Sequence, residues 1–173
     1  TNIVGTTNEQ YLADNVFCND RSISTDTPSG YSNLGYGTEI TAYRWNYIAD
    51  DTYNNKMMLT CPQQNDAFTV NDTSKGNGAL TYPVGLLSTD EIVLAGGWDE
   101  ENSGYYLYSG QDWWASSPYA FDGSYANVRD VFSDGSADFF YFGSSGVRPV
   151  FNLKAEVLAQ GSGTAEDPYR ISS

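Results

Sequence analysis

The chain has 173 residues, which is enough for one domain that buries its own core. Only eight Lys and Arg balance 22 Asp and Glu, so the formal net charge is −14 and phosphate-rich partners, nucleic acid and anionic membranes, are disfavoured. Histidine is absent, which removes the commonest general base and the commonest transition-metal ligand. We therefore expect a single domain, 1–173, without enzymatic activity, metal or cofactor.

Residues 1–78 are predicted to be a loop-rich N-terminal half. Near its start, Thr7 is predicted to cap a short helix by accepting a hydrogen bond from the amide of Gln10. Residues 39–59 mix aromatic and β-branched residues without a clean period, which leaves helix and strand open. The polar stretches on either side of them predict surface loops.

The two cysteines of the chain, Cys18 and Cys61, lie too far apart for a CxxC redox or zinc motif. Together they could close one disulfide, which would stabilise the fold by about 4 kcal/mol in the chain-entropy model. Two buried free thiols are the alternative. The disulfide is the prediction, and it favours an oxidising, extracellular environment.

Residues 79–173 are predicted to form a scaffold of strands and one helix. The first strand covers 79–87, where Pro83 requires the start or the edge of a sheet. Ser88 and Glu91 then form a capping box, and the helix that it opens should end at a pair of glycines. The acidic run that follows could hold calcium through oxygen ligands or form a solvated turn.

A second group of strands follows in the C-terminal half. A strand that begins with Trp113 should end at Pro118, and 125–131 predicts the next strand. Val131 is out of phase with the alternation of that strand, which predicts a bulge near Asp130.

The remaining strands are joined by turns rich in Gly and Ser. Residues 133–136 predict a hairpin turn into a strand over 137–142, and another strand is expected at 147–153. A last edge strand is expected at Tyr169 and Ile171. Short helices around twisted antiparallel strands, with long loops, define an α+β fold.

Residues 105–148 hold half of the aromatic residues of the chain, interleaved with Ser, Gly, Asp and Asn. Rigid amphipathic rings among adaptable small polar residues are typical of antibody-like binding surfaces. The alternative is the Tyr-rich core of a small β-domain. The candidate ligand-binding residues of this stretch are Trp113, Tyr119, Phe121, Asp122, Tyr125, Asn127, Arg129, Asp130, Phe132, Asp138, Phe139, Phe140 and Tyr141.

Several short motifs follow one another along most of the chain. They are FCNDRS at 17–22, YPVGL at 82–86, DE at 90–91, AGG at 95–97, YLYSGQ at 106–111, WxxSP at 114–118, GVRPV at 146–150, NLK at 152–154 and GTxxDPY at 163–169. In this order they resemble a family of uncharacterised bacterial and phage surface proteins, some of them pilin-like. The C-terminal part resembles the C-type-lectin fold in its formylglycine-generating-enzyme-like form, which carries the variable protein of diversity-generating retroelements.

The resemblance implies a fixed scaffold with a variable region over 105–148. Trp114, the SP pair at 117–118 and the segment 146–149 would belong to the scaffold, and the residues between them would form the diversified surface. Arg148 is expected to be partly buried, with its guanidinium donating to backbone carbonyls or a carboxylate. Formylglycine-generating enzymes use C-terminal cysteines, which this chain lacks, so their chemistry is not expected here.

The function expected from the sequence is a surface-displayed receptor or adhesin that binds a protein or a glycan. One alternative is a structural pilin or appendage subunit that associates with its own copies. Another is a carbohydrate-active enzyme that uses two of the carboxylates Asp122, Asp130, Asp134 and Asp138. The expected location is extracellular, at a cell surface or on a virion, with no membrane insertion by this fragment and no anchor in it.

Overall fold

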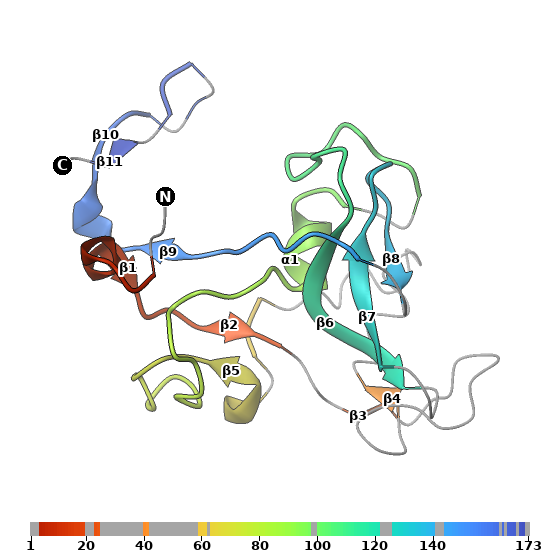
Figure 1. Ribbon diagram of the computed structural model, residues 1–173, viewed down its shortest axis with the longest axis horizontal. Coiled ribbons are helices and arrows are strands. Elements are labelled where there is room, and N and C mark those ends of the chain that lie inside the picture. Colours follow the sequence, from red (N-terminus) through yellow and green to blue (C-terminus); the bar gives the residue numbers. More distant parts are fainter. Residues whose placement is uncertain are drawn as a thin grey trace.

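The computed structural model describes residues 4–19, 23–24, 40–41, 59–61, 63–97, 100–121, 126–140, 144–162, 164, 166–168 and 170–171. In this part of the chain, short antiparallel strands and short helices are joined by long loops, in a loop-rich α+β arrangement (Figure 1). The elements are η1 (Thr7–Tyr11), β1 (Leu12–Ala13), β2 (Phe17–Cys18), β3 (Ile23–Ser24), β4 (Ile40–Thr41), η4 (Gln64–Asp66), β5 (Ala67–Phe68), α1 (Thr89–Leu94), β6 (Trp113–Phe121), β7 (Ala126–Val131), β8 (Ala137–Phe140), β9 (Asn152–Leu153), η5 (Ala155–Val157), β10 (Leu158–Gln160) and β11 (Arg170–Ile171).

The largest sheet has three antiparallel strands in the order β6-β7-β8 (Figure 1). The other described strands form two-stranded pairs, β1 with β9, β2 with β5, β3 with β4 and β10 with β11. The β1–β9 pair joins the start of the described chain to its last quarter, since Leu12 lies opposite Leu153. The hairpin turn predicted before β8 is confirmed, because Gly135 adopts a φ of 89° and the Phe132 amide donates to the Ser136 carbonyl.

The buried core lies at one end of the three-stranded sheet, where α1 and the loop before β6 pack against it. Its members are Ile92, Tyr105, Trp113, Ala115, Val131 and Ala137. Trp113, Val131 and Ala137 are neighbours in the register, so all three strands contribute to the core at the same level. This end of the sheet is the anchored end, and the end near Phe121, Ala126 and Phe140 is the far end.

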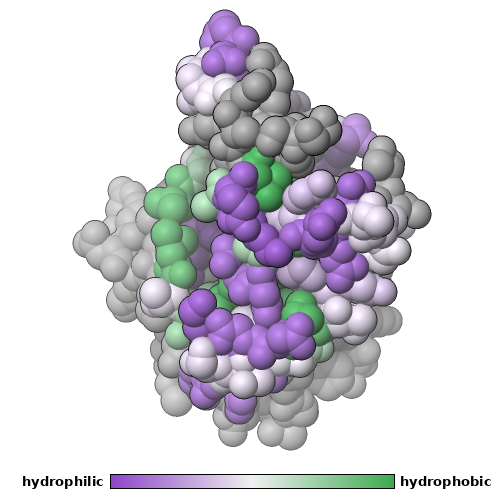
Figure 2. All heavy atoms as spheres, turned by 90° about the vertical axis from the view of Figure 1, so that its left-hand side faces the viewer, coloured by the Kyte–Doolittle hydropathy of each residue, from purple (hydrophilic) through white to green (hydrophobic). Residues whose placement is uncertain are grey.

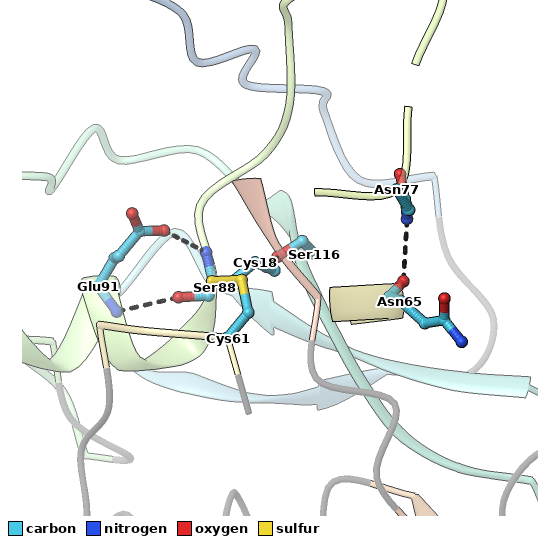
Figure 3. Close-up of a disulfide and its surroundings, with 7 residues drawn as sticks. All are labelled: Cys18, Cys61, Asn65, Asn77, Ser88, Glu91 and Ser116. Carbon is cyan, nitrogen blue, oxygen red and sulfur yellow. Dashed lines mark hydrogen bonds between the residues drawn. A yellow bond between two sulfur atoms is a disulfide. The ribbon is translucent and has the colours of Figure 1, made fainter. Parts of the chain in front are cut away.

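The helix α1 forms where the sequence predicts it. The Glu91 amide donates to Ser88 Oγ over 3.3 Å, and the Ser88 amide donates to Glu91 Oε2 over 2.8 Å (Figure 3). After the helix, Gly96 has a φ of 101° and its amide donates to the Val93 carbonyl, while the next amide donates to Ile92. This is a Schellman ending. Both predicted ends of the helix are confirmed.

The predicted disulfide is also confirmed. Cys18 and Cys61 are bridged with an S–S distance of 1.99 Å, across a sequence separation of 43 residues (Figure 3). Cys18 lies in β2, which pairs with β5, and its carbonyl accepts a hydrogen bond from Ser116 Oγ of β6. The bridge therefore fastens the N-terminal segments close to the central sheet.

The strand that begins at Trp113 does not end at Pro118, as the sequence predicts, but continues to Phe121. Proline is tolerated because β6 is an edge strand of its sheet, where a residue without an N–H can be accommodated. The register between β6 and β7 shifts on both sides of Pro118. An irregularity is therefore present next to Asp130, between the Trp114–Asp130 and Pro118–Val128 pairs, but the extra residues belong to β6. The pairing of β7 with β8 is regular through Asp130.

The strand predicted over 79–87 is wrong. Of its residues, Gly85 alone forms a β-bridge, with Val150, and the strand predicted over 147–153 is reduced to that bridge and β9. The Leu80 amide donates to the Thr69 carbonyl, and the Val84 amide donates to the nearby Tyr82 carbonyl. Local turns thus take the backbone groups that a strand would need.

Smaller differences concern the N-terminal half and the tail. Thr6, one residue before the predicted Thr7, caps η1, which is a 3-10 helix. Strand β3 lies in a stretch predicted to be a surface loop, and β4 lies in residues 39–59, where the sequence leaves helix and strand open. Most of both stretches lies outside the described residues. The expected last edge is present at Ile171 within β11, while Tyr169 lies outside the described residues.

Candidate ligand-binding surface

The strand register brings several predicted ligand-binding residues together at the far end of the sheet. Phe121 lies opposite Ala126, Asn127 lies opposite Ala120, and Phe140 lies opposite Val128. By backbone position, Tyr119, Phe121, Asn127 and Phe140 lie at or near this end. Asp138 and Phe139 lie opposite Asp130 and Arg129, closer to the anchored end. Asp122, Tyr125 and Tyr141 lie outside the described residues.

Three of the predicted residues are not displayed on the surface. Trp113 is 3% exposed, Arg129 7% and Asp130 1%. The expectation of display is wrong for them, because they lie in or beside the buried core instead of at the far end of the sheet. Phe132 is half-buried at the turn after β7, also at the anchored end.

Arg148 has the partly buried position expected from the sequence. Its guanidinium carbon lies 5.1 Å from the centroid of the Trp113 ring, and its Nη1 donates to the Leu107 carbonyl. A guanidinium stacked over an indole gains both cation–π attraction and packing. Arg148 thus fixes the loop before β6 to the segment that follows the aromatic stretch.

The segment 144–146 is held along β6 on the side away from β7. The Trp114 amide donates to the Gly146 carbonyl, and the Gly146 amide donates to the Asp112 carbonyl over 2.8 Å. Ser145 Oγ donates to the buried carboxylate of Asp130 over 2.6 Å. Both chain ends of the aromatic stretch are therefore fixed at the anchored end of the sheet.

A buried hydroxyl joins the helix to the same strand. Ser117 is fully buried, and its Oγ accepts a hydrogen bond from the Thr89 amide at the start of α1, over 2.9 Å. Ser116, its neighbour, donates its amide to the Leu87 carbonyl. Sequence reasoning had no signal for these pairings, because the partners lie almost thirty positions apart in the chain.

Two carboxylates of the anchored end are predicted to change stability with pH in opposite directions. Burial raises the pKa of Asp130, against hydrogen bonds from Ser145 and the backbone, whereas hydrogen bonds from Ser136 lower the pKa of Asp134. The contribution of Asp130 is present below pH about 4 and is lost as the pH rises through its raised pKa. The contribution of Asp134 is present above pH about 4 and is lost as the pH falls through its lowered pKa.

We therefore expect Asp130→Asn to gain melting temperature relative to the wild type as the pH rises from about 4 to 7. Asp134→Asn is the control, and its difference from the wild type should move the other way over the acidic range. Melting curves of the three proteins in buffers of equal ionic strength measure both differences. Parallel curves for the two variants would contradict the assignment.

The aromatic stretch also has described residues that face solvent outside the sheet. Tyr106 is 90% exposed and Tyr108 is exposed at the edge of the turn before β6, while Tyr105 is buried. The space-filling view shows the described part of one face as mostly hydrophilic, with hydrophobic side chains in separate patches (Figure 2). The rings of this stretch are thus divided between core and surface.

Within the described ranges, no group of three or more Asp, Glu or Cys side chains is arranged to hold a metal ion. Of the carboxylates considered for sugar hydrolysis, Asp130 accepts a hydrogen bond from Ser145, and Asp134 stabilises the turn through Ser136. Asp138 lies opposite Asp130 in the strand register, and Asp122 lies outside the described residues. None of the described helices has the length and apolar character needed to span a bilayer.

Comparison of the chain with protein families, with curated proteins and with solved structures finds no match.

Proposed function

We propose that this chain is a surface-displayed binding protein whose aromatic-rich far end of the β6-β7-β8 sheet binds a protein or a glycan. In this proposal the scaffold is C-type-lectin-like, and the chain is the variable protein of a diversity-generating retroelement. The residues at the far end would then be the positions that diversify. The anchored end would keep its structure while those residues change.

The observation that carries the proposal is the division of one sheet into two ends. At the anchored end, Trp113, Val131 and Ala137 are buried, and Arg148 and Ser145 fix the flanking segments. At the far end, the register gathers strand positions whose residue types suit a binding surface. A surface that must tolerate substitutions needs such a rigid support beneath it.

The binding role is tested with arrays of glycans and of extracellular protein domains, using the intact chain. Ligands found in this way are then measured against a variant with Tyr119→Ser, Phe121→Ser and Asn127→Ser. We expect an affinity loss of at least about tenfold, because central aromatic residues dominate binding energy at such surfaces. Tyr82→Ser, an exposed tyrosine outside the stretch, is the matched control and should bind normally.

The melting temperatures of the variants must equal that of the wild type, so that a loss of binding can be assigned to the changed surface and not to unfolding. Binding that survives the triple substitution would place the ligand elsewhere on the molecule and contradict the proposal. The diversification part is tested in the flanking DNA, where a reverse-transcriptase gene and a template repeat differing opposite adenines are expected. An intact locus that lacks both would contradict that part alone.

A further inference from the structure

A hollow of about 420 Å³ lies beside the disulfide, far in sequence from the aromatic stretch. Its volume is within the range of sites that hold small molecules. It is lined by Val16, Cys18, Leu59, Thr60, Cys61, Gln63, Gln64, Ala67, Ser74 and Lys75. Figure 3 shows the two bridged cysteines of this wall in their surroundings.

The lining differs from the rest of this acidic chain. The described residues that line it include no Asp or Glu, although the chain has 22 of them. Val16, Leu59 and Ala67 contribute apolar surface together with the disulfide, and hydroxyl, amide and ammonium groups supply the polar part. Such a surface suits a ligand with one apolar face and several hydrogen-bonding groups.

One wall of the hollow is held by hydrogen bonds. Gln64 Nε2 donates to the Thr73 carbonyl over 2.8 Å and to the Gly76 carbonyl over 3.1 Å. The carboxylate of Asp14 accepts from three successive backbone amides, those of residues 70–72. The turn that carries Ser74 and Lys75 is therefore fixed before any ligand arrives, which lowers the entropic cost of binding.

The charge at this wall is balanced. Lys75 Nζ lies 3.0 Å from Asp72 Oδ2, and hydrogen bonds from Ser74 and Lys75 lower the pKa of Asp72 to about 2. The two charges largely cancel, so neither a strong cation nor a strong anion is selected. The ammonium group, with three donors, keeps two for a neutral acceptor such as a hydroxyl.

We propose that this hollow binds a small, neutral, hydroxyl-rich ligand with one apolar face, the chemistry of a sugar unit. The apolar face lies on Leu59, Val16 and the disulfide. Thr60 and Gln63 supply the hydrogen-bonding groups at the rim, because an amide and a hydroxyl each both donate and accept. The site is separate from the far end of the sheet and does not depend on the function proposed there.

The test uses saturation-transfer NMR of the intact chain with a panel of neutral mono- and disaccharides. Leu59→Arg places a long charged side chain into the hollow, and Leu94→Arg makes the same change on α1. The two leucines are 59% and 60% exposed, so both variants should fold normally. We expect at least one sugar to receive saturation from the wild type and from Leu94→Arg but not from Leu59→Arg.

A second variant, Thr60→Val with Gln63→Ala, removes polar groups without filling the space. It should weaken binding of the same sugar by roughly thirtyfold, since two lost hydrogen bonds contribute about 1 kcal/mol each. No transfer to any sugar of the panel would overturn the proposal. Transfer that persists in Leu59→Arg would overturn it too, because the sugar would then bind elsewhere.

The result is independent of the aromatic surface. The triple variant at Tyr119, Phe121 and Asn127 should bind the panel sugar as the wild type does. If the triple variant loses the sugar signal while Leu59→Arg keeps it, the sugar binds at the far end of the sheet, and the proposal of a second site is overturned.

Discussion

Replacing Trp113 with alanine is expected to lower the free energy of unfolding by about 3–5 kcal/mol. The indole is 3% exposed and packs in the core at the level where all three strands of the sheet meet. Its removal leaves a cavity between α1 and the sheet, and it also takes the ring from beneath the Arg148 guanidinium. Urea denaturation followed by circular dichroism measures the loss.

Tyr106→Ala is the matched control, because this aromatic residue of the same stretch is 90% exposed. Its effect should stay within about 0.5 kcal/mol. A double-mutant cycle with Arg148→Ala should show a coupling of about 0.5–2 kcal/mol between Arg148 and Trp113. Equal costs for Trp113→Ala and Tyr106→Ala would mean that the indole does not support the sheet.

The features that the sequence predicts correctly are those that a few neighbouring residues decide. The Ser88–Glu91 capping box needs only four consecutive residues, and the end of α1 needs a glycine that accepts a positive φ. The turn at Gly135 is of the same kind, because its φ of 89° is a conformation that glycine adopts without strain. Local chemistry therefore sets the ends of the elements.

The features that it predicts wrongly depend on partners distant in the chain. β6 continues through Pro118 because it is an edge strand, and the amide of Ser116, just before the proline, donates to the distant Leu87 carbonyl. Nothing near Pro118 in the sequence encodes that partner. The same holds for 79–87, where Gly85 meets Val150 across the fold instead of forming a strand.

For the candidate site, composition singles out one stretch of the chain but does not assign the role of each ring. Trp113 and Tyr106 stand seven positions apart among similar neighbours, yet one is buried and the other is exposed. Alternation along a strand separates the two faces only when one face is polar. Between 137 and 142 both faces of the strand carry aromatic residues, so the pattern could not distinguish buried rings from exposed ones.

Removing the disulfide is the second large change. The variant Cys18→Ala with Cys61→Ala should lose about 4 kcal/mol of stability, since the bridge closes a loop across 43 residues. For a chain of this size, that loss lowers the melting temperature by roughly 8–16 °C. Differential scanning calorimetry of the oxidised protein and the variant measures the difference. Adding a dithiol should bring the wild type to the level of the variant and leave the variant unchanged.

Hydrogen exchange should then show where the loss is concentrated. β2 and β5 pair over only two residues each, and Phe17 faces Phe68 directly beside the bridge, so their amides should lose protection first. The amides between β7 and β8 should keep theirs, because the core around Trp113 does not include either cysteine. Equal loss across both regions would mean that the bridge supports the central sheet as well, through the Ser116 hydroxyl bound to the Cys18 carbonyl. In that case Ser116→Ala should reproduce part of the loss with the disulfide intact.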